Sequence, residues 1–273
     1  MNQRPIPFIK AHGTGNDFVL IPDLANEYPL EPEHVRALCD RHFGIGADGV
    51  IRVVRTDSGS PRFFMDYRNA DGSLAQMCGN GARVFVAYLF REGLVAGPDV
   101  EFGTRAGTLR AHIYAPTDIE IDMGVPSHGP EFDAVTVHQG AEARLGSSVH
   151  VPNPHAVVEV ADMAGVGTLN DPPRWEPAEI FPEGVNVEFV EYVAPGHVRM
   201  RVWERGVGET LSCGTGACAV GLVSRARHPQ DGSTWRVDVP GGTVFVRVGD
   251  GDQVFLRGPV AFVAEGLTSL VNT

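Results

Sequence analysis

The sequence predicts an α+β fold made of two halves of similar build. One motif, a cysteine followed by two glycines that flank a small polar residue and then by alanine, occurs as CGNGA at 78–82 and as CGTGA at 213–217. Short segments typical of strands outnumber helical segments in both halves. Internal repetition indicates a duplicated unit, and many strands with few helices favour mainly antiparallel sheets over repeated βαβ units.

The duplication extends beyond the cysteine motif. The two cysteines are 135 residues apart (213 less 78), and the same offset relates Asn69 to Glu204 and Gly107 to Gly242. Glycine and proline cluster at 122–130, where we expect the halves to join. One cysteine in each half suggests a site between the halves.

Strands are predicted where short apolar or alternating segments are bounded by turn-forming residues. In the first half they cover 18–21, 50–55, 62–67, 100–102, 108–114 and 119–123, and in the second half 135–138, 149–151, 156–160, 187–192, 198–204, 236–239, 243–248 and 254–257. Helices are predicted after each cysteine motif, where apolar residues are spaced like a helix face, and over 32–42, which Pro32 introduces.

Composition and charge exclude several classes of protein. The chain has 273 residues, 43% of them hydrophobic and 21% charged, which predicts a soluble globular protein. Its net charge is −12 and it has no cluster of Lys and Arg, so we expect neither nucleic acid nor a membrane as partner. The first residues lack a signal-peptide core, and no stretch approaches the ~20 apolar residues of a membrane span. A cytoplasmic location follows.

The four cysteines divide into two kinds. Cys39 and Cys218 lie within apolar helical segments, and we expect both to be packing residues. Cys78 and Cys213 stand on Gly-rich turns at predicted helix N-termini, a setting that lowers the pKa of a thiol and presents backbone N–H groups to an anion. No CxxC pair occurs, so we predict no metal site, and thiols of a cytosolic chain are expected to stay reduced.

Two sequence features argue against organic cofactors. Residues 44–49 match G-x-G-x-x-G, but a predicted helix precedes them and a predicted strand follows, the reverse of the order in a dinucleotide-binding fold. Lys10 is the only lysine and has no phosphate-binding loop beside it, whereas pyridoxal phosphate enzymes hold their cofactor on a lysine. We therefore expect chemistry without a cofactor.

Two activated thiols on opposite sides of a substrate would suit the inversion of a carbon acid. One thiolate removes a Cα proton from one face, and the other thiol supplies a proton to the opposite face, while helix N-termini stabilise the charge that spreads onto the substrate carboxylate. A single copy of the motif would be an ordinary helix start with an incidental cysteine. Two copies at matched offsets favour the catalytic interpretation.

Further polar residues beside glycine or proline are candidates for the same site. Taken singly, an asparagine in such a place is more often a turn former, and a lone histidine is more often structural. The candidates are Asn16, Asn69, Asn153, His155, Asn186, Glu204 and Arg205.

At these residues the chain resembles the diaminopimelate epimerase family. The resemblance rests on HGTGNDF, MDYRNADGSLAQMCGNGAR, NPH, GVNVEF, WERGVGET and SCGTGACA, which follow in order between Lys10 and Pro259. It implies two pseudo-symmetric domains, each a mostly antiparallel sheet curled around a central helix, with the last residues returning to the first domain. The bounds are then 1–122 with 266–273, and 123–265.

The resemblance also implies an activity and an assembly. The family interconverts LL- and meso-diaminopimelate without a cofactor, in the synthesis of lysine and peptidoglycan precursors. A homodimer acting on a small amino-acid substrate is implied.

The roles of individual residues follow from the same resemblance. Cys78 and Cys213 would be the catalytic acid and base, and His155 and Glu204 would adjust their pKa values. The substrate would be bound by Asn16, Asn69, Gly79, Asn80, Asn153, Asn186, Glu204, Arg205, Gly214 and Thr215.

Two departures from the family pattern and several alternatives accompany this interpretation. Gly49 stands where many members have a pocket glutamine, and Pro152 stands where a glycine commonly precedes Asn-Pro-His.

A two-thiol racemase of proline, hydroxyproline or histidine would use two cysteines in the same way, but it would have less use for a pocket lined by several asparagines and an arginine. A non-catalytic binding module or a thiol redox protein is the alternative outside this class, and neither would exchange a Cα proton.

Overall fold

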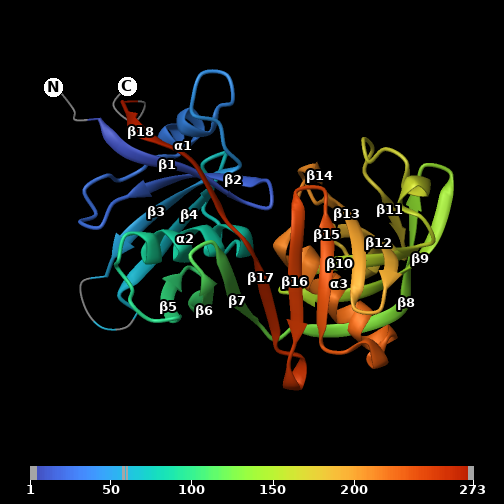
Figure 1. The fold of residues 1–273 in the computed structure, drawn as a ribbon. Helices are drawn as coiled ribbons and strands as arrows, with labels where there is room; N and C mark the ends of the chain where they lie inside the picture. Colours follow the sequence, from blue (N-terminus) through green and yellow to red (C-terminus); the bar gives the residue numbers. More distant parts are fainter. Residues whose placement is uncertain (1–4, 57–58, 60, 270–273) are drawn as a thin grey trace. The chain divides into compact units, whose positions relative to one another are not determined.

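The computed structural model describes residues 5–56, 59 and 61–269, and the chain divides into two compact units (Figure 1). The first unit comprises residues 1–121 and 258–273, and the second comprises residues 122–257. Of the segment 266–273 that was expected to return to the first domain, residues 270–273 lie outside the described residues. The domain bounds given above remain a prediction.

In the described part of the first unit, strands pair in the order β18–β1–β2–β3–β4–β5–β6–β7. The pairs β2–β3 and β4–β5 are parallel, and the others are antiparallel. The strands are β1 (Ile6–Gly13), β2 (Asn16–Pro22), β3 (Gly49–Arg55), β4 (Phe63–Asn69), β5 (Asp99–Thr104), β6 (Gly107–Ala115), β7 (Asp118–Gly124) and β18 (Ala261–Thr268).

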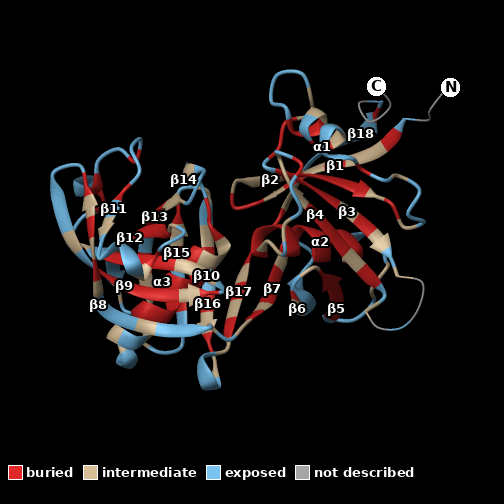
Figure 2. Ribbon diagram, turned by 180° about the vertical axis from the view of Figure 1, so that it is seen from behind, coloured by how far each residue is buried: buried red, intermediate tan, exposed pale blue. Residues whose placement is uncertain are grey.

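Helix α2 (Gly79–Arg91) occupies the centre of this sheet, and α1 (Pro32–Cys39) covers its outside. Every residue of α2 up to Leu89 is buried, and the helix contacts β1, β2, β3, β4 and β6. A helix that is buried on all sides must be enclosed by its partners, so the sheet curves around it. Figure 2 shows the buried positions running along α2 and these strands.

The second unit repeats this plan around α3 (Gly214–Arg227). Its described strands pair in the order β11–β8–β9–β10–β12–β13–β15–β16–β17, with β14 also on β13. The strands are β8 (His128–Gln139), β9 (Glu142–Val151), β10 (Asn153–Val160), β11 (Arg174–Glu176), β12 (Asn186–Ala194), β13 (His197–Glu204), β14 (Gly208–Thr210), β15 (Thr234–Val239), β16 (Gly242–Val248) and β17 (Val254–Pro259). Short 3₁₀ helices are η1 (Met163–Val166), η2 (Ala178–Ile180), η3 (Pro229–Asp231) and η4 (Asp250–Asp252).

The two units are duplicates in topology. The parallel pairs β10–β12 and β13–β15 of the second unit correspond to β2–β3 and β4–β5 of the first. In each unit the central helix comes, along the chain, between the two strands of the second parallel pair. The offset of 135 residues recurs at the starts of the helices (79 and 214), of β5 and β15 (99 and 234), and of β6 and β16 (107 and 242). The predicted α+β fold with two repeated halves is confirmed.

Each predicted strand overlaps an observed one, but β1, β11, β14 and β18 were missed. Pro7 lies within β1, and proline argues against a strand in sequence-based prediction. Five consecutive residues of β18 are exposed, so its sequence lacks the alternation that marks a half-buried strand. The predicted helix 32–42 ends at Cys39, because Asp40 accepts hydrogen bonds from the N–H groups of His42 and Phe43 and forms a turn instead.

Cys39 and Cys218 are packing residues, as expected. Cys39 belongs to the apolar core between α1 and the first sheet, where burial raises its thiol pKa to about 12. Cys218 is fully buried within α3.

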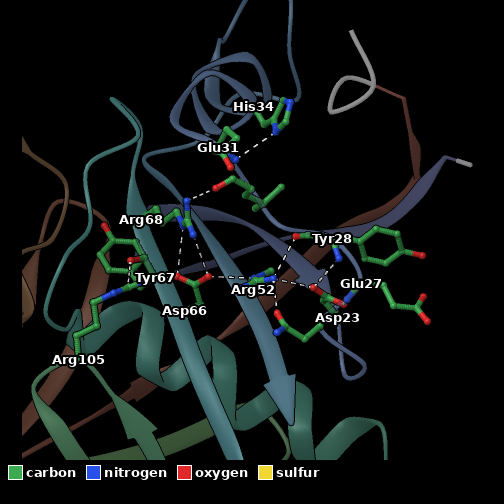
Figure 3. A network of polar contacts seen from close by, with 12 residues as sticks. Asp23, Glu27, Tyr28, Glu31, His34, Arg52, Asp66, Tyr67, Arg68 and Arg105 are labelled. Carbon is green, nitrogen blue, oxygen red and sulfur yellow. Dashed lines mark hydrogen bonds and ion pairs between the residues drawn. The ribbon is translucent and has the colours of Figure 1, made fainter. Parts of the chain in front are cut away.

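A buried ionic network ties β3 and β4 to the segment before α1 (Figure 3). The Asp66 carboxylate forms ion pairs with Arg52 at 3.0 Å and with Arg68 at 3.3 Å, and it also pairs with Arg105. Arg52 donates a second hydrogen bond, of 3.0 Å, to the buried Asp23. Although burial opposes ionisation, the hydrogen bonds from Arg105 and Arg68 hold the pKa of Asp66 below its usual value.

Candidate active site

Both motif cysteines are the N-cap residues of the central helices. Cys78 has an extended backbone (φ −142°, ψ 119°), and its Sγ accepts a hydrogen bond from Gly81 N at 3.5 Å. Cys213 has φ −110° and ψ 116°, and its Sγ accepts from Gly216 N at 3.4 Å. The predicted placement of each thiol at a helix N-terminus is confirmed, and the two are equivalent in their own units.

The glycine that follows each cysteine by three residues is required by close packing. A Cβ on Gly81 would lie 3.0 Å from Met65 and 3.1 Å from Ile51. A Cβ on Gly216 would lie 2.7 Å from the Glu188 carboxylate and 3.3 Å from Cys213 Sγ. The helix starts can therefore approach the strands only without a side chain there.

In the first unit, Asn16 joins Cys78 and Asn80. Asn16 Oδ1 accepts a hydrogen bond of 3.2 Å from Asn80 Nδ2, and the Cys78 thiol lies 3.6 Å from the same oxygen. Asn16 Nδ2 donates to Asp48 Oδ2 at 2.8 Å. Three of the predicted site residues thus form one polar cluster, and Asp48 fixes the orientation of the Asn16 amide.

The G-x-G-x-x-G segment is the support for this cluster. It lies between α1 and β3, so the predicted order of helix, glycines and strand is confirmed. Asp48 and Asp17 exchange backbone hydrogen bonds with each other's carboxylates, and Arg41 pairs with both, at 2.7 and 3.0 Å. Lys10 binds Asp17 at 2.6 Å and also the Gly46 carbonyl, so the only lysine anchors this loop.

Asn69 and Gly49 are placed differently from the Asn16 cluster. Asn69 ends β4, and its recorded side-chain bond within the described residues is to Ser73 Oγ at 3.0 Å, in the following turn. A Cβ on Gly49 would lie 2.6 Å from the Arg68 carbonyl and 2.7 Å from the Tyr67 ring. Those neighbours close over the position where relatives were expected to carry glutamine, which gives the departure at Gly49 a steric reason.

In the second unit, Cys213 is grouped with Thr215 and Glu204. The Cys213 thiol lies 3.5 Å from Thr215 Oγ1 and hydrogen-bonds to the Glu204 carboxylate, which also accepts from Thr210. Burial is the main cause that raises the pKa of Glu204, and the charge of Glu188 adds to it. Glu204 is therefore in contact with one of the two motif cysteines, and its predicted role in adjusting the pKa of the cysteines stays a prediction.

The expectation of a lowered thiol pKa is wrong for Cys213. This side chain is buried, and burial followed by the charges of Glu204 and Glu188 raises its pKa well above the ordinary value. The hydrogen bonds from Thr215 and Gly216 act in the opposite direction and are smaller. Desolvation of a thiolate beside two carboxylates outweighs the helix N-terminus.

Asn153, His155 and Asn186 lie on the parallel strands β10 and β12. His155 is fully buried and contacts Asn153 Oδ1 through Nε2 at 3.0 Å and Glu188 Oε1 through Nδ1 at 2.7 Å. Asn186 Oδ1 accepts the Arg205 backbone N–H at 2.9 Å. Asn153 pairs with Val151 across Pro152, so the departure at Pro152 leaves Asn153 in its strand.

Arg205 directs its guanidinium to backbone rather than to the cysteine. Nη1 donates to the Glu183 carbonyl at 3.0 Å.

Asp48 and Glu188 contact predicted site residues but were not themselves predicted from the sequence. Glu188 carried a detectable signal, because it is the only charged residue in the otherwise apolar run after Asn186 in GVNVEFV.

The reactivity of Cys213 provides a direct test of its surroundings. A raised pKa keeps the thiol protonated at neutral pH, and since the thiolate is the nucleophile, alkylation of Cys213 by iodoacetamide should accelerate about tenfold per pH unit between pH 7 and 9. Glu204→Gln removes a neighbouring charge and should accelerate the reaction at pH 7, whereas the exposed Glu209→Gln should not. Peptide mass spectrometry measures both rates, and equal rates in the two variants would contradict this account.

No helix among the described residues is long and apolar enough to cross a membrane. No group of three or more His, Cys, Asp or Glu side chains in that part of the chain is arranged to hold a metal ion.

Comparison with known sequences identifies one family. The family described as diaminopimelate epimerase matches residues 8–129 and 147–263. A diaminopimelate epimerase of Streptomyces coelicolor is 45% identical over 96% of this chain and 94% of its own. One from Thermobifida fusca is 44% identical over 95% of this chain and 96% of its own.

Solved structures with a similar fold have more distant sequences. A hydroxyproline epimerase from Agrobacterium vitis, with bound trans-4-OH-L-proline, has a TM-score of 0.70 at 16% identity and covers 98% of this chain and 93% of its own. A Bacillus anthracis phenazine biosynthesis protein of the PhzF family has a TM-score of 0.69 at 17% identity, over 97% and 99%. These similarities concern the fold.

Proposed function

Because the chain belongs to the diaminopimelate epimerase family, we propose that it interconverts LL- and meso-diaminopimelate in the synthesis of lysine and peptidoglycan precursors. The observation that carries the proposal is the identity of 45% over nearly the whole chain to a diaminopimelate epimerase. The duplicated N-cap cysteines supply the two proton carriers that such an inversion needs. The proposed reaction requires no cofactor and no metal.

In the proposed mechanism, Cys78 and Cys213 serve opposite faces of one Cα. A thiolate removes the Cα proton and becomes a thiol, the electron pair left on Cα is shared with the carboxylate, and the other thiol gives its proton to the opposite face and becomes the thiolate. The high pKa of Cys213 makes it the thiol, and hence the proton donor, in the free enzyme.

The substrate carboxylate at the reacting centre is held, in this proposal, by the helix starts Gly79-Asn80 and Gly214-Thr215. The N–H groups at the start of a helix point along its axis away from the helix, and they and the helix dipole both favour an anion there. Glu204 adjusts the pKa of Cys213, which its hydrogen bond to that thiol supports. The remaining proposed substrate contacts are Asn16, Asn69, Asn153, Asn186 and Arg205, with His155 acting on the pKa of the cysteines.

Assembly and location are proposed on the family resemblance alone. We infer a homodimer in the cytoplasm, acting on a free small-molecule amino acid. Neither nucleic acid nor membrane is proposed as a partner.

Deuterium incorporation tests the proposed reaction. Incubation with LL-diaminopimelate in D₂O should yield meso-diaminopimelate that carries deuterium at Cα, because the proton is delivered by a thiol that has exchanged with solvent. Proton NMR follows both isomers and the loss of the Cα signal. L-proline, trans-4-hydroxy-L-proline and L-histidine are the controls and should keep their Cα protons.

Two outcomes would overturn this function. Exchange and inversion of one of the control amino acids, with none of diaminopimelate, would identify a two-thiol racemase instead. No exchange into any of the four would leave a binding or thiol redox protein.

A further inference from the structure

The second unit contains a cavity of about 540 Å³ at the C-terminal end of α3. It is lined by the last turn of α3, by β16 and β17, which Figure 1 labels, and by η4 between these two strands. Pockets for small molecules commonly have volumes of about 300–1,000 Å³. The charged and aromatic side chains of the lining are Arg225, Arg247, Asp250 and Phe255.

The cavity and the cysteine motif of this unit lie at opposite ends of the same elements. Arg225 follows Cys213 by 12 residues of α3 (225 less 213), a rise of about 18 Å along a helix. The start of β16 lies beside the motif, because Gly241 N donates to the Leu211 carbonyl at 2.9 Å, whereas Arg247 near the end of β16 lines the cavity. The cavity is therefore separate from the proposed reaction centre.

Positive charge exceeds negative charge in the lining. Two arginines face one aspartate there, although the chain as a whole has a net charge of −12. Arg225 has no acidic partner among the described residues. The helix dipole favours a cation in the last turn of α3, but it does not account for the second guanidinium, Arg247, which comes from a strand.

The Arg247 guanidinium is supported by an aromatic ring. Its central carbon lies 3.7 Å from the centroid of the Phe255 ring, directly across the antiparallel pair β16–β17. A guanidinium that stacks on a ring keeps its N–H groups at its edge, where they can bind a carboxylate or a phosphate. Phe255 therefore holds a cation at the cavity without neutralising it.

The first unit has acidic residues at the positions that flank the equivalent cation. By the offset of 135 residues, His112 of β6 corresponds to Arg247. Both cross-strand neighbours of His112 are acidic, Asp99 and Glu120, and His112 Nδ1 lies 2.8 Å from the Asp99 carboxylate. The corresponding neighbours in the second unit are Thr234 and Phe255. The duplicated fold thus tolerates acids beside this cation, and the second unit lacks them where the cavity lies.

We propose that this cavity binds a small anion, a molecule that carries a carboxylate or a phosphate group, through the guanidinium groups of Arg225 and Arg247. Both anionic groups have oxygens that match the paired N–H groups of a guanidinium, which is why arginine is common where either is recognised. The site goes beyond the proposed function and does not depend on it.

The side-chain N–H signals of the two arginines provide a direct test. In ¹⁵N-labelled protein, the arginine Nε–H signals are assigned through bonds from the backbone and followed while inorganic phosphate or succinate is added at constant ionic strength. We expect the Arg225 and Arg247 signals to shift together and to saturate, with a dissociation constant of about 1 mM or lower. Glycerol is the neutral control and should shift neither signal. The probe that binds more tightly identifies the preferred anionic group.

Two single substitutions and one matched control test the residues themselves. Arg225→Gln and Arg247→Gln should each weaken binding by about tenfold or more, because each removes a charge-assisted hydrogen bond. Arg199→Gln makes the same change of charge in the same unit, at a half-exposed side chain that pairs with Glu191 and does not line the cavity. It should leave the affinity unchanged.

Two results would overturn the proposal. One is the absence of a saturable shift at Arg225 and Arg247 in the wild type, a measurement that needs no variant to fold. The other is saturable binding of the anion with wild-type affinity in both glutamine variants, which would place the ion elsewhere. Neither result bears on the proposed function, because no diaminopimelate is present.

Discussion

Replacing either Cys78 or Cys213 by alanine is expected to abolish epimerisation. Each thiol is the N-cap of its central helix with a glycine N–H on its sulfur, and in the proposed mechanism each serves one face of the substrate. A positioned acid or base accelerates a reaction by a factor of about 10²–10⁴. We therefore expect kcat to fall by a factor of at least about 10² in both variants. Chromatographic separation of LL- and meso-diaminopimelate measures the residual turnover.

The other two cysteines provide the matched controls. Cys39 lies in the core beside α1 and Cys218 is fully buried in α3, so alanine at either position should lower stability slightly and leave most activity. Circular dichroism of all four variants establishes that they are folded. Near-normal turnover in Cys78→Ala or Cys213→Ala would reject the two-base mechanism.

The features that could be predicted from sequence are those set by local chemistry. The N-cap position of both cysteines follows from the Gly-x-Gly turn and the apolar helix face after it. In each motif this turn and this helix face are only a few residues from the cysteine. The duplication was visible because its offset is constant from Asn69 to Gly107 and from Glu204 to Gly242. The same offset appears in the observed starts of helices and strands.

The features that could not be predicted depend on residues brought together by strand pairing. Asp48 orients Asn16 from 32 residues away, and Glu188 meets His155 from 33 residues away across the parallel pair β10–β12. The pKa of Cys213 was mispredicted for the same reason, because the burial and the two carboxylates that raise it come from tertiary contacts. A helix N-terminus alone predicts only a lowering of the thiol pKa, which is the smaller of the two opposing effects at Cys213.

Replacing Asp66 by alanine is expected to produce the largest loss of stability outside the cysteine clusters. Its side chain is 4% exposed and pairs with Arg52, Arg68 and Arg105, whose own exposures are 12, 15 and 20%. Removing one partner from a buried ionic network leaves uncompensated charge and costs about 3–5 kcal/mol. Urea denaturation followed by far-UV circular dichroism measures the free energy of unfolding.

The location and pH dependence of this loss identify its cause. All three tryptophans lie in the second unit, so hydrogen exchange by mass spectrometry, rather than tryptophan fluorescence, should follow the first unit and show faster exchange in β3 and β4. The pKa of Asp66 is lowered in the folded protein, so its contribution is complete above the ordinary value of 3.8 and is lost as the pH falls below it. Asp66→Asn should therefore show a shallower loss of stability with acid than the wild type. Glu101→Ala, which removes an exposed pair with Arg110, is the control and should cost less than about 1 kcal/mol; an equal cost in the two alanine variants would contradict the role assigned to the buried network.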